Sequence, residues 1–306
     1  MLKIEHLEKN YGSFKALNGL NLEIAKGQLF GFVGPNGAGK TTTMKIISGL
    51  LAADGGSVYI DGINALKDSR KLKQKIGYMP DFFGTYNNLK AYEYMEFYAS
   101  VYGIVGRSAR TLCQNLLDLV NLSDKADSYV DGLSRGMKQR LCLARSMVHN
   151  PELLILDEPA SGLDPRARFE MKEILRNLSD MGKTIIISSH ILPELAEMCS
   201  SVGIIEHGEM VAQGTVEEIQ NTLQMTKPVM IQVTQPEEAD VAMHLLRENP
   251  DIQTLSRQEL TISATLKGED ENARTEPREE REAALLSSLI MAGVSICSFH
   301  REEGNL

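Results

Sequence analysis

The chain has 306 residues, a formal net charge of −9 at pH 7 and 42% hydrophobic residues. This length supports a large core in more than one domain, and the acidic balance argues against a general nucleic-acid binder, which normally carries a basic face. The four cysteines form no Cys-x-x-Cys pair and no apolar run reaches the roughly 20 residues of a membrane span, so we expect buried thiols in a cytosolic, reducing compartment, without a zinc site, disulfide framework, signal peptide or bilayer crossing.

The first motif is a phosphate-binding loop. The apolar run Leu29–Val33 predicts a buried strand, Thr41–Leu50 predicts a helix, and the segment between them, GPNGAGKTT, fits the P-loop pattern at each fixed position. Its glycines let backbone N–H groups close around phosphates, Lys40 can reach the β- and γ-phosphates, and the Thr41 hydroxyl is a hard ligand suited to Mg²⁺. A simple glycine-rich turn would need none of this, so we predict a nucleoside triphosphate site. The candidate binding residues here are Gly34, Pro35, Asn36, Gly37, Ala38, Gly39, Lys40, Thr41 and Thr42.

Two further segments carry chemistry. In LSRGMKQRLCLARSM, which begins at Leu133, Ser134 is either an ordinary helix N-cap or part of an anion site at a helix N-terminus. The later run LLILDEP, Leu153–Pro159, predicts a short strand ending in two carboxylates, the form of a Walker B motif. We expect Asp157 to help hold Mg²⁺ and Glu158 to act as a catalytic general base on an attacking water. With the P-loop, this pair predicts hydrolysis as well as binding.

The order of these motifs resembles that of ABC-type ATPases: LSRGMKQR, then LDEP, then SGLD. In that family the LSGGQ-like segment binds the γ-phosphate held by the opposite subunit, which implies this role in trans for Ser134 and Gly136. The segment departs from the family pattern, since Arg135 replaces a glycine and Met137 a glutamine. Arg135 could add charge near the phosphate or point to solvent, and this departure puts the hydrolysis rate in doubt.

The resemblance implies roles for three more residues. Tyr11, in KNYGSFKAL, corresponds to the aromatic residue that stacks on adenine, although a lone tyrosine is more often a core residue. Asp164, in SGLD, matches the loop that contacts the partner subunit and the nucleotide, but a turn before a helix explains it equally well. His190, after the strand predicted at Thr184–Ser189, resembles the catalytic switch histidine that contacts the γ-phosphate.

After IGYMP the family normally carries a glutamine near Mg²⁺, and here Asp81 occupies that position. A carboxylate could ligate Mg²⁺ directly, yet it repels phosphate when no metal is bound, so we keep Asp81 as a candidate metal ligand. The following segment, NNLKAYEYMEFYASVYG, predicts an aromatic-rich helix that in the family begins a helical subdomain facing the membrane partner. Most of these aromatics are expected in the core, and a minority could line a docking groove.

The predicted fold class is α/β: a P-loop NTPase of the ABC type with an antiparallel β subdomain, a helical insertion at about 84–148 and a small C-terminal α+β accessory domain. We expect the ATPase domain at 1–224 and the accessory domain at 225–306. The pattern of the second predicts strand, helix, strand, strand, helix, strand at Val229–Thr234, Glu237–Glu248, Ile252–Leu255, Leu260–Leu266, Ala283–Met291 and Val294–Ser298. The charged stretch Gly268–Arg281 is expected to be an exposed loop entering a helix, with no binding role.

A single set of motifs implies a dimer of ATPase subunits, identical or paralogous, because Lys40 and Ser134 would serve the same ATP from different chains. The resemblance is greatest to subunits paired with separate ABC-2-type permeases. It implies ATP and Mg²⁺ as cofactors, an integral-membrane permease as partner, an export direction, no nucleic acid, and a location at the cytoplasmic face of a bacterial membrane. The alternative is a soluble ABC-type ATPase acting on ribosomes or nucleic acid, and a P-loop kinase would leave LSRGMKQR unexplained.

Overall fold

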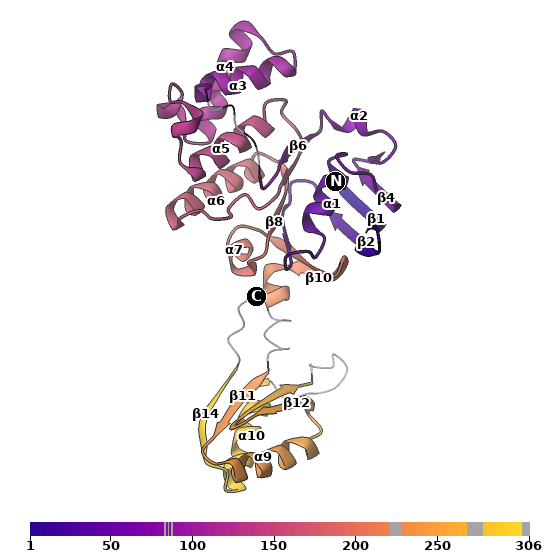
Figure 1. Cartoon of the computed structure of the whole chain (residues 1–306), viewed down its shortest axis with the longest axis vertical. Coiled ribbons are helices and arrows are strands. Elements are labelled where there is room, and N and C mark those ends of the chain that lie inside the picture. The colour runs from indigo at the N-terminus through magenta and orange to yellow at the C-terminus, as the bar shows by residue number, and fades with distance from the viewer. Residues whose placement is uncertain (83, 85, 87, 221–227, 268–277, 302–306) are drawn as a thin grey trace. The chain divides into compact units, whose positions relative to one another are not determined.

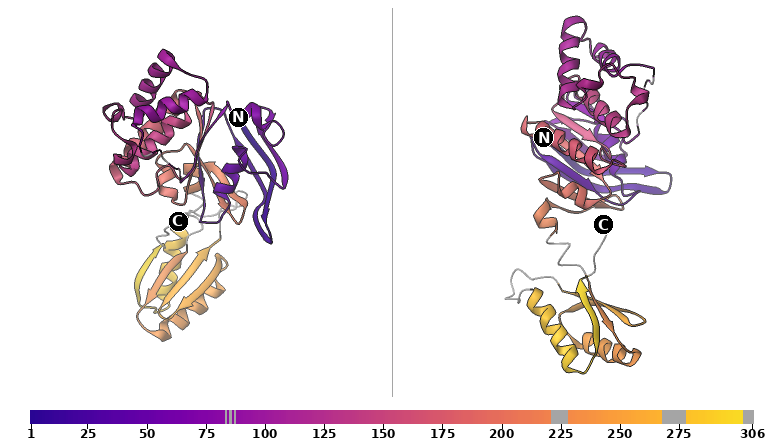
Figure 2. Two further views of the ribbon diagram at one scale, coloured as in Figure 1. Left: turned by 45° about the horizontal axis from the view of Figure 1, so that its top comes forward. Right: turned by 90° about the vertical axis from the view of Figure 1, so that its left-hand side faces the viewer.

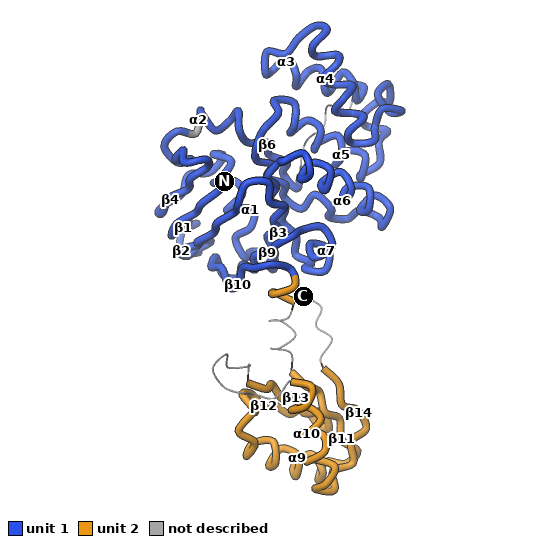
Figure 3. The backbone as a smooth tube through the Cα atoms, turned by 180° about the vertical axis from the view of Figure 1, so that it is seen from behind, with its two compact units in different colours: residues 1–216 blue, residues 217–306 orange. Residues whose placement is uncertain are grey.

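The computed structural model describes residues 1–306 except 83, 85, 87, 221–227, 268–277 and 302–306. These residues form two compact units, Met1–Val216 and Glu217–Leu306, which Figure 3 shows in different colours. The domain boundary predicted after residue 224 falls among residues 221–227, outside the described residues. Each unit is therefore described by itself.

The first unit begins with an antiparallel sheet of order β2-β1-β4-β5. Along β2 the side chains alternate, with Leu20, Leu22 and Ile24 buried and Asn21 and Glu23 more exposed, as expected for a sheet with one face on the core. The four strands are β1 (Leu2–Tyr11), β2 (Phe14–Ile24), β4 (Gly55–Ile60) and β5 (Ile63–Asn64).

The second sheet of this unit has the order β10-β9-β3-β8-β7-β6, with parallel pairing throughout except between β10 and β9. Its central strands are buried along their whole length, which explains the apolar runs of β3 and β7 and the three isoleucines of β8. The strands predicted at Leu29–Val33 and Thr184–Ser189 are confirmed. The six strands are β3 (Leu29–Val33), β6 (Ile76–Met79), β7 (Leu153–Leu156), β8 (Thr184–Ser189), β9 (Ser201–Glu206) and β10 (Glu209–Thr215).

One hydrophobic core joins the two sheets through α1 (Lys40–Ile47), whose Met44 and Ile46 are fully buried in the same cluster as Leu20 and Ile155. Figures 1 and 2 show the helices that contain residues 91–146 on the side of the parallel sheet away from the antiparallel sheet. The predicted helical insertion thus contains α3 (Ala91–Val101), α4 (Gly106–Leu119) and α5 (Arg135–Ser146), with 3₁₀ turns at Ser123–Lys125 and Val130–Gly132. The other helices of the unit are α2 (Ser69–Leu72), α6 (Pro165–Asp180) and α7 (Leu192–Ala196).

The second unit follows the predicted order of elements, strand, helix, strand, strand, helix, strand, a split βαβ succession. Its antiparallel sheet has the order β12-β13-β11-β14 and shares one core with both helices. The elements are β11 (Val229–Val233), α9 (Pro236–Glu248), β12 (Ile252–Gln258), β13 (Thr261–Leu266), α10 (Arg278–Met291) and β14 (Ile296–Arg301). Among the helices that the structure describes, none is both long and apolar enough to pass through a bilayer.

The stretch expected to be an exposed loop entering a helix does enter a helix, but its last residues are helical and two of them are buried. Residues 268–277 lie outside the described residues, but Arg278 already begins α10, and both Arg278 and Arg281 are buried. The Arg278 guanidinium pairs with Glu282 at 2.7 Å, and Arg281 donates to the Lys267 carbonyl at 3.1 Å. Charged residues can be buried here because these partners replace water.

The cysteine prediction is right for three residues and wrong for one. Cys113, Cys142 and Cys199 are buried, and burial raises the pKa of Cys113 to about 11 and of Cys142 to about 12. Cys297, on the edge strand β14, is exposed. Side chains alternate between the two faces along a strand, and Cys297 lies on an exposed face. The apolar residues around it in the sequence do not indicate this face.

Candidate functional site

Four neighbouring parallel strands end at one edge of the sheet and deliver the predicted site residues together. Their order is β3-β8-β7-β6, and the pairs Val33 with Ser189, Ile187 with Leu156, and Leu156 with Met79 set their register. Ligands commonly bind where parallel strands end in this way. A cleft of about 400 Å³ at this edge is lined by Tyr11, Phe14, Ala16, Asn36, Gly37, Gly39, Lys40, Thr41, Thr42, Asp81, Glu158, Ser161 and His190.

The loop between β3 and α1 requires glycine for steric reasons. A Cβ on Gly34 would lie 2.2 Å from the Ile205 carbonyl oxygen. Gly39 has φ of 111°, and a Cβ there would lie 2.8 Å from the Ala16 carbonyl oxygen. The backbone of the loop can therefore approach β2 and β9 closely while Lys40 and Thr41 open the helix at the cleft.

Lys40 is buried and holds the loop in shape through its ammonium group. The Nζ atom donates to the carbonyl oxygens of Gly34 at 2.6 Å and Pro35 at 3.2 Å, and it lies 3.9 Å from Glu158 Oε1. Burial lowers the pKa of Lys40, although Glu158 and Asp157 favour its charged form. An ammonium group in this position can bind further negatively charged groups, such as phosphate oxygens.

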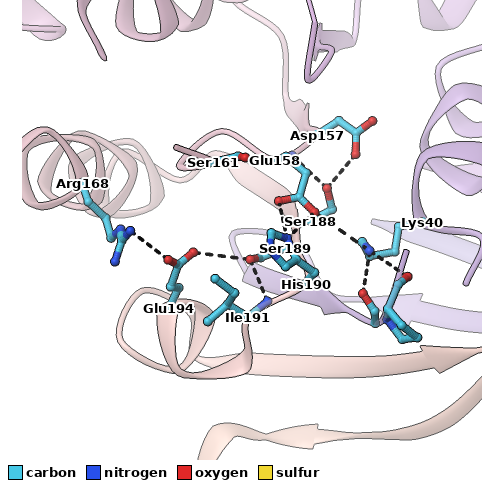
Figure 4. Close-up of polar contacts among 12 residues, drawn as sticks. Lys40, Asp157, Glu158, Ser161, Arg168, Ser188, Ser189, His190, Ile191 and Glu194 are labelled. Atoms are coloured by element: carbon cyan, nitrogen blue, oxygen red, sulfur yellow. Dashed lines mark hydrogen bonds and ion pairs between the residues drawn. The ribbon is translucent and has the colours of Figure 1, made fainter. Parts of the chain in front are cut away.

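The two carboxylates after β7 have different surroundings. Asp157 is buried and accepts the Ser188 hydroxyl at 2.7 Å, while the same hydroxyl accepts the Glu158 N–H at 2.9 Å (Figure 4). Glu158 has φ of 50°, a region that non-glycine residues adopt rarely and that marks functional sites. Ser188 thus fixes both residues in place.

Glu158 faces both Lys40 and His190. Its carboxylate lies 3.3 and 3.4 Å from His190 Nδ1, and Figure 4 shows the imidazole between Glu158 and the turn after β8. Burial raises the pKa of Glu158, against the opposing effects of His190 and Lys40. A carboxylate with a raised pKa beside a cleft suits a group that takes up or orients a proton.

The expected Mg²⁺ ligands also fit an oxygen-binding cation. Thr41 and Asp81 line the cleft. The charges of Asp157 and Asp81 both act on the Tyr78 phenol, and burial raises the pKa of that phenol. The buried phenol oxygen has no hydrogen-bond partner within the described residues. Hydroxyl and carboxylate oxygens are the ligands Mg²⁺ prefers, with water and phosphate completing its coordination. No group of three or more histidine, cysteine or acidic side chains suited to a metal occurs in the described part of the chain.

Two aromatic residues, Tyr11 and Phe14, lie at the tip of the β1–β2 hairpin. They are partners in the pairing of β1 with β2, they are 50% and 58% exposed, and both line the cleft. The Lys9 ammonium lies 5.8 Å from the centre of the Tyr11 ring. The alternative that Tyr11 is a core residue is therefore wrong, and its open ring face can accept a flat base.

Ser134 and Asp164 do not line this cleft. They line a separate hollow of about 510 Å³ between the N-termini of α5 and α6, together with Met137, Arg166 and Ala167 among others. Each also caps its helix: Ser134 Oγ accepts the Met137 N–H at 3.3 Å, and Asp164 Oδ1 accepts the Ala167 N–H at 2.9 Å. The N-cap interpretation of Ser134 is therefore confirmed, and Asp164 precedes a helix as its alternative interpretation expected. Capping does not exclude a second role for these residues in an anion site at the two helix N-termini.

The structure adds a packing role for Gly136 and locates Arg135, whose direction the sequence left open. Gly136 is buried, and a Cβ there would lie 2.8 Å from Ala167 Cβ, so it lets α5 and α6 approach closely. Arg135 is exposed, and its guanidinium lies against Gly162, where a Cβ would be 2.7 Å from its Cζ. Arg135 therefore neither points simply to solvent nor reaches the P-loop cleft of its own chain.

Three contributors to the site were not predicted from the sequence. Ser188 and Phe14 could have been found, because one is a polar residue ending an apolar strand and the other a second aromatic in the KNYGSFKAL hairpin. Glu194, which contacts the turn carrying His190, has no sequence signal of its own.

Comparison with known proteins identifies the fold and the family. The ABC transporter family model matches residues 17–161. The linearmycin resistance ATP-binding protein LnrL of Bacillus subtilis is 34% identical over 275 residues, covering 86% of this chain and 88% of that protein. The Nod factor export ATP-binding protein I of Burkholderia orbicola is 39% identical over 213 residues, 70% of each chain.

Solved structures agree. The MJ1267 ATP-binding cassette of an ABC transporter superposes with a TM-score of 0.67 at 25% identity, covering 73% of this chain and 94% of that chain. The bacterial ABC transporter cassette MJ0796, solved as a dimer, gives a TM-score of 0.65 at 27% identity, covering 71% and 99%. The predicted α/β P-loop fold with its antiparallel subdomain is confirmed, and the relatives favour transport over action on ribosomes. The chain belongs to the ABC transporter family and is an ATP-binding subunit that hydrolyses ATP.

Proposed function

We propose that this subunit powers export through a separate integral-membrane permease, by closing on a second ATPase subunit around ATP. Support for export comes from the Nod factor export protein, and support for the whole chain acting in this way comes from LnrL, whose similarity covers both units. The mechanism rests on the separation of two sites. Lys40, Glu158 and His190 line the cleft at the P-loop, whereas Ser134 and Asp164 line the hollow between the N-termini of α5 and α6.

In the cleft the phosphates of ATP bind the P-loop N–H groups and displace the Lys40 ammonium from the carbonyl oxygens of Gly34 and Pro35. Tyr11 stacks on the adenine ring. Glu158 accepts a hydrogen bond from the attacking water, and His190 holds the γ-phosphate on the opposite side of that carboxylate. A bound Mg²⁺, held by Thr41, Asp157 and Asp81, would neutralise charge on the phosphate oxygens.

The hollow between the N-termini of α5 and α6 completes the site of the other subunit. Two helix N-termini converge there, with the hydroxyl of Ser134 and the loop ending in Asp164 at the surface. Such an arrangement stabilises anionic oxygens, and it would contact the γ-phosphate held by the partner. Loss of that phosphate on hydrolysis then releases the two subunits, which gives a mechanical cycle.

The permease would dock on the aromatic part of the helical region. Phe97 and Val101 lie one turn apart on α3 and are 43% and 64% exposed, and the exposed Tyr86 ring lies 5.4 Å edge-on from Phe97. A contiguous set of exposed apolar side chains of this kind fits an amphipathic helix of a partner. The subunit would act at the cytoplasmic face of a bacterial membrane, where the permease holds it.

The test is recovery of the native complex. A tagged full-length chain is purified from membranes of its own organism in mild detergent, and the co-purifying proteins are identified by mass spectrometry. A multi-span protein that is lost when Phe97 and Val101 are both changed to glutamate supports the proposal. Recovery of ribosomes or nucleic acid without a multi-span protein contradicts it.

A further inference from the structure

His190 stands in a tight turn that the neighbouring serine closes. The Ser189 hydroxyl accepts the Ile191 N–H at 3.0 Å, so one side chain bridges the residues on both sides of His190. Ser189 is itself buried. The position of the imidazole against Glu158 therefore depends on which way this hydroxyl points.

Glu194 determines the direction of that hydroxyl. A hydroxyl has one proton to donate, and Ser189 Oγ directs it to Glu194 Oε2 at 3.5 Å, which leaves a lone pair for the Ile191 N–H. The other oxygen of Glu194 accepts the Arg168 guanidinium of α6 at 3.0 Å. Figure 4 shows this row from Arg168 through Glu194 and Ser189 to His190.

The ion pair is shielded from water on its carboxylate side, because the Glu194 side chain is 12% exposed, whereas the Arg168 side chain is 37% exposed. On its far side the Arg168 guanidinium also donates to the Leu163 carbonyl oxygen at 3.4 Å. Leu163 directly precedes Asp164 in the SGLD loop, which lines the hollow assigned to the partner's ATP. One guanidinium thus contacts both the partner-facing loop and the support of His190.

We infer that Arg168 and Glu194 are positioning residues for hydrolysis, which relay the position of the SGLD loop to His190. A partner pressing on this loop moves the Leu163 carbonyl, and the Arg168–Glu194 pair carries that displacement to Ser189 and the turn. This inference rests on the proposed role of His190 in the reaction.

Neither Arg168 nor Glu194 is among the residues that line the nucleotide cleft, so loss of the pair should leave ATP binding intact and slow the chemical step. A displacement of about 1 Å at a reacting group can cost up to a hundredfold in rate. We expect Glu194→Ala to lower kcat by about tenfold or more with KM for ATP changed less than about twofold, since only geometry in the transition state is affected. Glu194→Gln retains an acceptor for Ser189 and should recover part of the rate.

The chain offers a matched control one helical turn along α6. Lys172 pairs with Glu197 at 3.3 Å and links α6 to the end of α7 in the same way, but no contact joins that pair to Ser189 within the described residues. Lys172→Ala should therefore leave kcat within about twofold of the unmodified chain, since exposed pairs contribute little. Equal slowing by Lys172→Ala and Glu194→Ala would mean that any loosening of these helices is sufficient.

The decisive experiment is a double-mutant cycle with His190→Ala, measured by single-turnover hydrolysis with the full chain in excess so that slow rates are resolved. If Glu194 acts through His190, Glu194→Ala costs nothing further in the His190→Ala background. An equal loss in both backgrounds would assign Glu194 to general stability and overturn the inference. If His190→Ala alone keeps the full rate, the proposed role of His190 fails; if it lowers the rate and Glu194→Ala does not, only the inference fails.

Discussion

Replacing Gly136 with alanine tests whether the close approach of α5 and α6 shapes the partner-facing hollow. The new Cβ would lie 2.8 Å from Ala167 Cβ, closer than carbon atoms tolerate, so the two helices must separate. Such overpacking typically costs about 1–3 kcal/mol, and the better helix propensity of alanine offsets about 0.5–1 kcal/mol. We expect a net loss of about 1–2 kcal/mol, or roughly 2–8 °C in the Tm of a unit of this size.

Thermal unfolding followed by circular dichroism measures this shift, since the chain contains no tryptophan. Gly132→Ala is the control, because a Cβ at that position meets nothing within 4 Å. Ala167→Gly removes the opposing methyl group, so Gly136→Ala should cost little in that background. ATP turnover should fall in Gly136→Ala because Ser134 and Asp164 cap the two helices that separate. An unchanged Tm and turnover in Gly136→Ala would refute this explanation of the glycine.

Three further outcomes are expected. Because burial raises the pKa of Glu158 and the carboxylate is the active form, turnover should begin to fall with decreasing pH above the ordinary glutamate value of about 4.3. A pH profile of kcat whose acidic midpoint lies at or below about 4.3 would contradict this. Of the four thiols, only that of Cys297 should react rapidly with a thiol reagent in the folded chain, and Cys297→Ser should abolish the rapid phase. Hydrogen bonds from Ser295 and Thr234 lower the pKa of Glu238 to about 2, so its contribution to stability is present above about pH 4.3 and is lost as the pH falls toward 2. Glu238→Gln should therefore lower the Tm at pH 7 and not at pH 2. An equal loss of Tm at both pH values would contradict this.

The sequence predicts the central strands well because β3 and β8 are buried along their whole length, and each therefore contains a run of apolar residues, LFGFV in β3 and the three isoleucines of TIIISS in β8. It also predicts which residues gather at the cleft, since the P-loop, Glu158 and His190 each follow directly after a strand. Local pattern and tertiary position agree at these points, and the motif spacing therefore carries three-dimensional information.

Other features depend on contacts between distant segments and have no local pattern. The sequence indicates for Gly136 only a role in binding phosphate. The structure shows that glycine is required there because Ala167, on another helix, leaves no room for a side chain. Glu194 lies among ordinary helix residues and gains its importance from Arg168 and Ser189. Arg278 resembles a solvent-exposed charge until Glu282 is seen to pair with it inside the second unit.

Sedimentation of the Glu158→Gln chain in ATP and Mg²⁺ tests the central claim most directly, namely that one ATP site is assembled from two subunits. The variant should bind ATP, fail to hydrolyse it and sediment as a dimer, whereas Glu158→Gln with Ser134→Arg should bind ATP and remain a monomer. If both variants stay monomeric with ATP bound while the unmodified chain, also monomeric, hydrolyses ATP at its full rate, the shared site does not exist.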